Sequence, residues 1–100
     1  MSTADDPPFD LAAIREGIDR VDERLVELLA ERAALVGQVV VYKRGHGMRV
    51  VDRKREDEML VRIADLARAN GLDPRVAQQV LRTIIDSFTL LEVEELGPDA

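Results

Sequence analysis

The sequence predicts an all-α fold: a three-helix chain (long, medium, long) that forms an intertwined helical homodimer. Apolar residues recur every three to four positions through most of the 100 residues, which is the period of helices packed along one face. Helix start and stop residues divide the chain into three such segments. The first segment is too long to bury its apolar stripe inside a chain of this size, and this favours pairing with a second copy.

One helical domain is expected over residues 10–96, between a disordered leader at 1–9 and a tail at 97–100. The leader is polar and holds two adjacent prolines, whereas Asp10 has the side chain of a helix N-cap. At the other end, Gly97-Pro98 is expected to terminate the last helix.

The first helix is expected to follow Asp10 and to end at Gly45-His46-Gly47, so that at 1.5 Å per residue it is about 50 Å long. Its apolar residues alternate in steps of three and four, like the seam of a helix packed on other helices. The β-branched run at 38–42 would also suit a strand. The stripe continues in phase through that run, which favours helix, although Gly17 and Gly37 each cost about 1 kcal/mol there. The stripe comprises Leu11, Ile14, Ile18, Val21, Leu25, Leu28, Leu35, Val39 and Tyr42.

Two further helices are delimited by their capping residues. Asp52 is a good N-cap for a helix over 53–70, which Asn70-Gly71 ends. Asp73-Pro74 supplies an N-cap and a first-turn proline for a helix from 74 to about 95. The apolar faces contain Met59, Leu60, Ile63, Leu66 and Ala67 in the second helix, and Val76, Val80, Leu81, Ile84, Ile85, Phe88 and Leu91 in the third.

Composition excludes several classes of function. The 14 basic and 20 acidic residues give a net charge of −6, which disfavours nucleic-acid binding. The absence of cysteine and the single histidine exclude thiol chemistry and a cysteine or histidine metal site, so no metal is expected. No stretch approaches the roughly 20 apolar residues of a membrane span. The acidic N-terminus lacks the apolar core of a signal peptide, and the expected location is the cytoplasm.

Charged residues interrupt the apolar stripe of the first helix. Arg32 stands where the seam predicts an aliphatic residue, and Lys43 follows after about three turns on the same face, with Val36 and Val39 between them. Two cations about 16 Å apart on one face would hold an anion between them, or would reach solvent or acidic neighbours instead. Arg15 lies about 25 Å before Arg32. It is either a surface residue or, in an antiparallel dimer, a neighbour of the partner's helix.

Two more charged features border the expected core. Arg55 and Glu56 belong to a charged run at 52–58, which alone would be read as a solvated face. Glu92 follows Phe88 by one turn and therefore lies on or beside the apolar face of the third helix. Burial would raise the pKa of its carboxyl and hold it protonated near neutrality, whereas a frayed last turn would leave it solvated.

Four motifs occur in a fixed order: IREGIDRVD at 14–22, LLAER at 28–32, Lys43 eleven residues later, and DRKRE at 52–56. In combination they resemble the type II, all-helical chorismate mutases over roughly residues 10–95. The resemblance implies an interlocked homodimer with two equivalent sites. It implies an isomerase that rearranges chorismate, a dianion, to prephenate by a pericyclic step, with no cofactor.

The resemblance also implies a role for each charged residue. Arg15 would reach from the partner subunit to one substrate carboxylate, and Arg32 would hold the other. Lys43 would hydrogen-bond the ether oxygen and a carboxylate, and Arg55 would lie near the ring.

Four further positions follow from the same resemblance. Asp52 and Glu56 would receive the ring hydroxyl, by backbone and side chain respectively. Glu92 stands where many members have a glutamine that donates to the ether oxygen, and some have glutamate. Phe88 stands where many have a small polar residue near a carboxylate, which is a departure from the common pattern.

Three alternatives remain open. Glu92 and Phe88 are also typical of 4-amino-4-deoxychorismate mutases of secondary, antibiotic-type pathways, while Asp52 and Glu56 favour a ring hydroxyl and hence chorismate. An isochorismate pyruvate-lyase has a similar fold. A non-catalytic helical dimerisation module is disfavoured, because a scaffold has no use for an arginine at position 32 of an apolar seam. The sequence does not specify a partner enzyme of the aromatic pathway.

Overall fold

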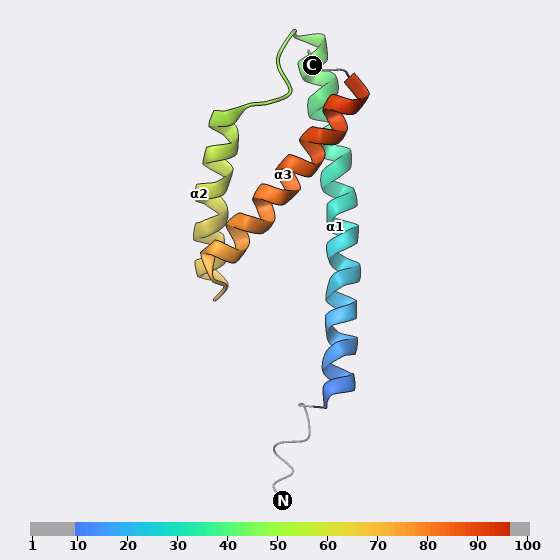
Figure 1. Cartoon of the computed structure of the whole chain (residues 1–100), viewed down its shortest axis with the longest axis vertical. Coiled ribbons are helices and arrows are strands. Elements are labelled where there is room, and N and C mark those ends of the chain that lie inside the picture. The colour runs from blue at the N-terminus through green and yellow to red at the C-terminus, as the bar shows by residue number, and fades with distance from the viewer. Residues whose placement is uncertain (1–9, 97–100) are drawn as a thin grey trace, which may run out of the picture. The chain divides into compact units, whose positions relative to one another are not determined.

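The computed structural model describes the backbone of residues 10–96 and the side chains of residues 10–94. It contains three helices, α1 (Leu11–Gly45), α2 (Arg53–Ala69) and α3 (Pro74–Leu96), and no strand within the described range (Figure 1). The predicted all-α, three-helix fold is confirmed, and the run at 38–42 is helical. The predicted leader at 1–9 and the tail at 97–100 lie outside the described residues.

The chain divides into two parts, residues 1–35 and 36–100, and each is described by itself. The first part holds the larger share of α1. The second holds the end of α1, a connector, α2 and α3. None of these three helices combines the length and the apolar character that crossing a bilayer requires.

Both α1 and α2 end at a glycine with left-handed backbone, as predicted. Gly47 has φ 65° and Gly71 has φ 70°, a conformation that suits a residue without a Cβ. The amide after each glycine donates to the carbonyl four positions before that glycine, at 2.8 Å after Gly47 and 2.9 Å after Gly71. These bonds form Schellman motifs, which satisfy carbonyls that the helix end would leave unpaired.

Aspartates cap the starts of the helices. The Oδ1 atom of Asp52 accepts from the amide of Arg55 at 3.0 Å, and that of Asp73 accepts from the amide of Arg75 at 2.9 Å. Asp10 accepts, at 3.4 Å, from the amide two residues ahead. Each helix therefore begins where a carboxylate satisfies an orphan amide of the first turn.

The helices α2 and α3 form an antiparallel hairpin, whose core is small (Figure 1). Ala64 and Ala67 of α2 and Ile85 of α3 are its buried apolar residues. The two alanines allow the α3 backbone to approach α2 closely. A bond of 3.1 Å from Gln78 Nε2 to the carbonyl of Leu60 adds a polar tie between the helices.

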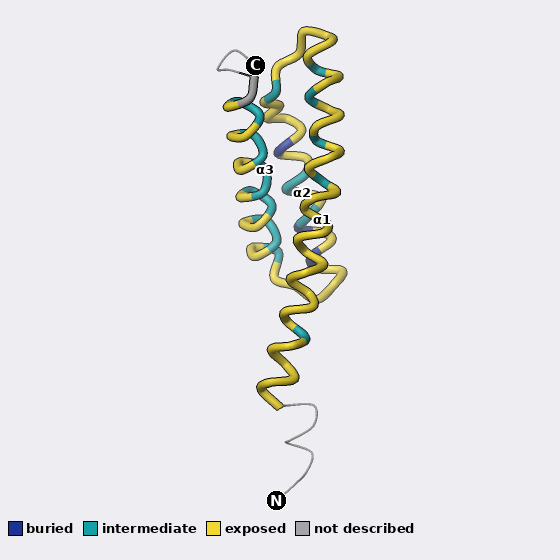
Figure 2. The backbone as a smooth tube through the Cα atoms, turned by 90° about the vertical axis from the view of Figure 1, so that its right-hand side faces the viewer, coloured by how far each residue is buried: buried dark blue, intermediate teal, exposed yellow. Residues whose placement is uncertain are grey.

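Much of the predicted core is less buried in the single chain. Six of the hairpin's predicted core residues are half-buried: Met59, Leu60, Ile63, Leu81, Ile84 and Phe88. No residue of α1 is buried, and every member of its predicted apolar stripe is 40–58% exposed (Figure 2). In the hairpin, the predicted core residues Leu66, Val76, Val80 and Leu91 are also exposed. Their apolar period is correct, but a two-helix hairpin covers only one side of each helix, so the prediction that these four are core residues is wrong for the isolated chain.

Candidate active site

Three predicted site residues come together at the start of α2. Asp52 caps the helix, and its backbone carbonyl accepts from the amide of Glu56 at 3.1 Å. Arg55, whose amide the cap satisfies, is exposed on the first turn. The cap therefore fixes the backbone from which Glu56 enters the hairpin, one turn after Asp52.

Glu56 is the buried charged residue of the described chain, with 7% of its surface exposed. Its Oε1 atom accepts from Arg82 Nη2 of α3 at 2.6 Å and from Arg53 Nη1 of α2 at 3.1 Å. Arg82 also donates to Asp86 Oδ1 at 2.9 Å. The hydrogen bonds to Glu56 first, and then to Asp86, raise the pKa of the Arg82 guanidinium, so it remains charged. Paired guanidinium donors offset the desolvation of the Glu56 carboxylate.

Lys43 lies near the end of α1 and is half-buried. Its Nζ atom donates to the backbone carbonyl of Val50 at 2.9 Å, which ties the connector to α1. An ammonium has three N–H donors. Among residues 10–94 one of them donates to Val50, which holds the Lys43 side chain in place.

Phe88 and Glu92 lie one turn apart on one face of α3, and both are half-buried. Each is engaged in an interaction within the chain, as is Arg32. Glu92 is thus neither fully buried nor fully solvated, and its position falls between the two environments that the sequence left open.

The two arginines of the first part differ in exposure. Arg15 is exposed and Arg32 is half-buried. Further along α1, in the second part, Val36 and Val40 are half-buried together with Lys43. Val39, which the sequence places on the same face of the helix, is 49% exposed in the single chain.

A hollow of about 270 Å³ lies between the start of α2 and the second half of α3. Of the predicted site residues it includes Glu56 alone. The residues that sequence reasoning missed are Arg53, Arg82 and Asp86, which surround the Glu56 carboxylate. A basic residue at position 82 within the apolar run of α3 was the available signal. The lining consists of Val51, Arg53, Glu56, Asp86, Thr89, Leu90 and Val93.

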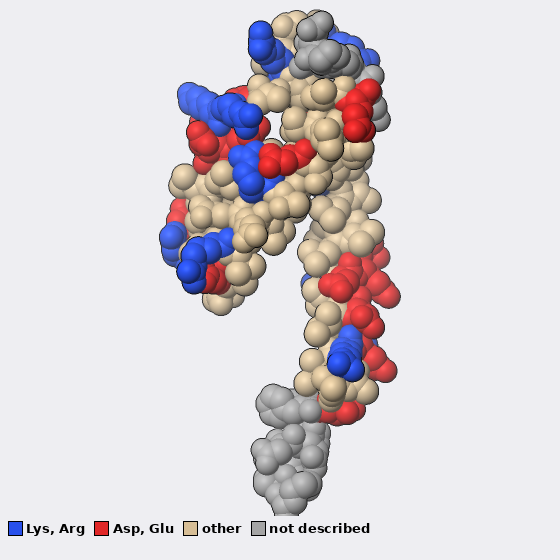
Figure 3. Space-filling view, in the orientation of Figure 1, with Lys and Arg blue, Asp and Glu red and all other residues tan. Residues whose placement is uncertain are grey.

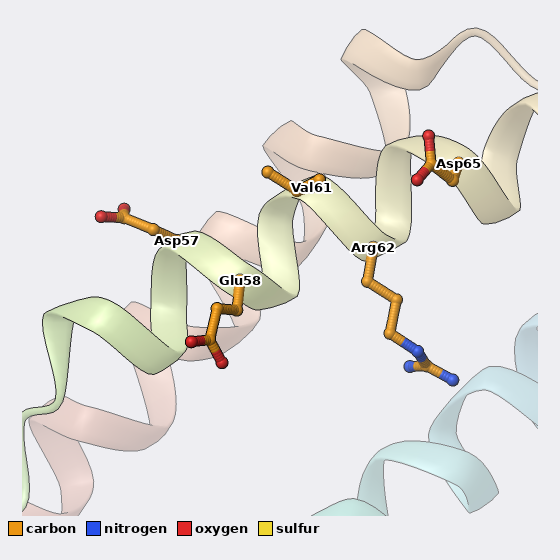
Figure 4. Close-up of a pocket in the computed structure, with 5 residues that line it drawn as sticks. All are labelled: Asp57, Glu58, Val61, Arg62 and Asp65. Atoms are coloured by element: carbon orange, nitrogen blue, oxygen red, sulfur yellow. The ribbon is translucent and has the colours of Figure 1, made fainter.

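A second hollow, of about 490 Å³, lies on α2 alone (Figure 4). Asp57, Glu58 and Asp65 supply three carboxylates against one guanidinium, from Arg62, and the side chains point in different directions. This surface repels a dianion. No group of three or more histidine or carboxylate side chains in the described part of the chain is placed to hold a metal ion.

Comparison with known proteins identifies the family. The family model for chorismate mutase type II matches residues 14–93. The chain belongs to the chorismate mutase type II family. The match confirms the resemblance seen in the sequence motifs, and it covers all eight predicted site residues. Their individual roles stay predictions.

Members and relatives of this family align with most of the chain. A T-protein from Enterobacter agglomerans is 37% identical over 81 residues, 80% of this chain and 22% of that protein. A chorismate mutase from Methanocaldococcus jannaschii is 29% identical over 86 residues, covering 86% of this chain and 87% of that protein. A bifunctional chorismate mutase/prephenate dehydratase from Escherichia coli K12 is 35% identical over 82 residues, 82% of this chain and 21% of that protein.

The chain spans about a fifth of the length of the T-protein and of the bifunctional protein, but most of the archaeal chorismate mutase. No solved structure matches the chain.

Proposed function

We propose that this chain is a chorismate mutase, an isomerase that converts chorismate to prephenate by a pericyclic rearrangement. The alignment with the archaeal relative named chorismate mutase carries the proposal, because it covers 86% of this chain and 87% of that protein. Such a reaction needs no nucleophile, and the chain offers no cysteine and a single histidine. The protein has to fold one dianion into a reactive chair and to stabilise charge on the ether oxygen.

Arginines are suited to the first task. A guanidinium binds a carboxylate through two parallel hydrogen bonds and so fixes its orientation as well as its position. In our proposal Arg32 holds one substrate carboxylate and Arg15 of a second copy holds the other. Fixing both carboxylates selects the conformer in which the bond-forming carbons approach each other.

Lys43 and Glu92 are assigned to the second task. The breaking C–O bond leaves negative charge on the ether oxygen in the transition state, and a preorganised donor there can be worth roughly 2.7–4 kcal/mol. The Val50 carbonyl holds Lys43 Nζ before substrate arrives, which supports such preorganisation. Glu92 would donate from the opposite side.

The ring hydroxyl is assigned to the start of α2. Asp52 would offer its backbone there. Glu56 would offer a carboxylate that is largely buried, although its Oε2 atom is not completely covered. Arg55 is exposed on the same turn, where it would lie near the bound ring.

A homodimer is part of the proposal. The apolar stripe of α1 runs from Leu11 to Tyr42 and is exposed along its whole length in the single chain. An apolar surface of that extent marks an interaction site, and a second copy would cover it in a closed, two-fold arrangement. The same arrangement would bring Arg15 of one chain to the site of the other.

Glu92 makes the proposed activity depend on pH. A carboxylate has no proton to donate, whereas a carboxylic acid donates one hydrogen bond, and a bound dianion favours the protonated form. We expect kcat to fall tenfold for each pH unit above the pKa that Glu92 has in the complex with substrate. Glu92→Gln should flatten that profile, because an amide donates at every pH. A Gln variant with the wild-type pH dependence would refute the role of Glu92.

Phe88 and Glu92 support one alternative substrate, 4-amino-4-deoxychorismate. The half-buried Phe88 and Glu92 also suit a 4-amino-4-deoxychorismate mutase, as the sequence motifs implied. An isochorismate pyruvate-lyase and a non-catalytic dimerisation module have no observation of their own in their favour.

The test is turnover. The purified protein is incubated separately with chorismate, 4-amino-4-deoxychorismate and isochorismate, and the products are identified by mass spectrometry. Prephenate formed from chorismate supports the proposal. Turnover of the amino compound alone would assign the protein to the alternative, and loss of pyruvate from isochorismate would assign it to the lyase. No turnover of any compound by folded protein would overturn the proposal of an enzyme.

A further inference from the structure

The carboxylate of Glu56 is held in an asymmetric way. Both of its hydrogen bonds, from Arg82 at 2.6 Å and from Arg53 at 3.1 Å, end on Oε1. No hydrogen bond to Oε2 is present among residues 10–94, yet no side-chain oxygen in that range is buried without a partner. Oε2 is therefore not fully buried, and it has lone pairs available for a donor; Glu56 also lines a hollow between α2 and α3.

Arg82 contributes most of this arrangement. It comes from α3, 26 positions after Glu56 in the sequence, and its side chain is 33% exposed. The other partner, Arg53, is 77% exposed, so its ion pair is weakened by solvent and by the mobility of a long side chain. Arg82 also donates a hydrogen bond to Asp86, one turn further along α3, and this bond holds its guanidinium in place.

The local charges cancel only because Arg82 is present. Glu56 and Asp86 carry two negative charges, and Arg53 and Arg82 carry two positive ones. Removing the Arg82 charge would leave a net charge of −1 around Oε2. A neutral hydroxyl donates to a carboxylate in either case, but a protonated amine is attracted by a net negative cluster and is held off by the Arg82 cation.

We propose that Arg82 is a positioning residue that sets substrate choice: it occupies Oε1 of Glu56, which leaves Oε2 for the ligand, and it neutralises the cluster, so the site takes a ring that bears a hydroxyl in preference to one that bears an ammonium. The inference rests on the proposed function, in which Glu56 receives the ring substituent. It separates chorismate from its 4-amino analogue at a residue that does not itself contact the substrate.

The experiment compares kcat/KM for chorismate and for 4-amino-4-deoxychorismate in matched variants. Arg82→Gln should raise the ratio of amino to hydroxy kcat/KM about tenfold, as expected for one partly screened charge. Arg82→Lys keeps the charge and should return the ratio to near the wild-type value. Arg68→Gln removes an exposed arginine paired with Asp65 on α2 and serves as the control, with no change in the ratio.

A second variant keeps the test decisive if Arg82→Gln fails to fold. Asp86 is 62% exposed, so Asp86→Asn should leave the hairpin intact while making the cluster positive. The ratio should then move in the opposite direction, down about two- to threefold. Added salt should reduce both shifts.

The outcomes distinguish the two proposals. If the wild-type protein turns over either substrate and the ratio stays fixed in Arg82→Gln and Asp86→Asn, Arg82 is merely structural and this inference fails while the proposed function stands. An equal loss for both substrates has the same meaning. If the folded wild type turns over neither substrate, the proposed function fails, and the inference that rests on it is overturned as well.

Discussion

The first segment of α1 and the α2–α3 hairpin share the same apolar period, but their apolar faces are buried to different extents within the chain. The segment at 11–35 buries none of its residues, whereas the hairpin buries Ala64, Ala67 and Ile85 within one chain. Periodicity therefore marks a packing face in both regions but does not say which chain packs against it. The hairpin is stabilised within its own chain, whereas the stripe of α1 is exposed there and would be covered in the proposed dimer.

Charge follows the same division. Acidic side chains gather over the N-terminal half of α1, while acidic and basic side chains stand side by side over the hairpin (Figure 3). In the hairpin, the Glu56–Arg82–Asp86 cluster joins α2 to α3. A substitution in the hairpin should thus act on the stability of the chain, and one in the α1 stripe on the association of chains.

The largest effect is expected from a charge in the middle of the α1 stripe. Leu25→Asp should weaken the dimer at least a hundredfold, because each buried leucine contributes about 1.5–3 kcal/mol and a dimer contains two copies. Turnover should fall with it. Sedimentation velocity and turnover at several protein concentrations measure both.

Ala30→Asp is the control for that experiment. It places the same charge about 140° around the same helix at 100° per residue and should leave the dimer unchanged. A dimeric, active Leu25→Asp variant would contradict the assignment of the stripe to an interface between chains. Equal effects of the two substitutions would contradict it too.

The next effect concerns where Arg15 acts. Arg15→Ala and Arg32→Ala should each lower kcat/KM by at least a hundredfold, because each removes a clamp on the dianion. If Arg15 serves the partner's site, unfolding and refolding an equal mixture of the two variants creates mixed dimers with one intact site each. Random pairing then restores about a quarter of the wild-type activity.

A control and a contrary result are available for the mixing experiment. Each variant refolded alone should stay inactive. A mixture no more active than its components, in a preparation shown by mass spectrometry to contain mixed dimers, would show that Arg15 and Arg32 serve the same chain's site.

A smaller effect, confined to stability, is expected from the hairpin core. Ile85→Ala should lower the free energy of unfolding by about 2–5 kcal/mol, because it removes buried methyl groups and leaves a cavity between α2 and α3. Urea denaturation measures the change. Val61→Ala, at a position 64% exposed, should change it by less than about 0.5 kcal/mol. Equal losses in the two variants would mean that Ile85 is not part of the hairpin core.

The helix ends were predictable from sequence because they are local. Two aspartates, Asp52 and Asp73, accept from nearby backbone amides, and two glycines, Gly47 and Gly71, adopt the left-handed backbone that ends a helix. The observed ends lie within one residue of those expected. The face that packs within the chain was only partly predictable. Leu66 and the other exposed positions follow the apolar period, which is the same for an intrachain and an interchain contact.

The candidate site shows the same limit. The motifs pointed to Glu56, but its partner Arg82 lies 26 residues away, and no periodicity links the two. Only the packing of α2 on α3 brings that guanidinium to the carboxylate. Residues that act through a long-range ion pair are therefore the part of the site that sequence reasoning missed.

The smallest effect is expected at the start of α3. Asp73 caps the helix, and hydrogen bonds from the side chain and then the backbone of Arg75 lower the pKa of its carboxyl from the ordinary value of 3.8. A carboxyl whose pKa is lower in the folded chain stabilises the fold above that ordinary value, and the contribution is lost as the pH falls through the folded value. Asp73→Asn keeps a capping oxygen but loses the charge.

We therefore expect Asp73→Asn to lower the melting temperature by about a few degrees at pH 7, since both partners of the ion pair are solvent-accessible. The difference from the wild type should shrink as the pH falls below 3.8 and through the lowered pKa of the folded chain. Asp65→Asn, which removes an exposed pair without a cap, should have a smaller effect at pH 7. A difference that does not shrink as the pH falls would show that the loss comes from the geometry of the cap and not from its charge. Dissociation of the proposed dimer should be the same in both variants, because Asp73 and Asp65 lie outside the α1 stripe that this dimer would bury.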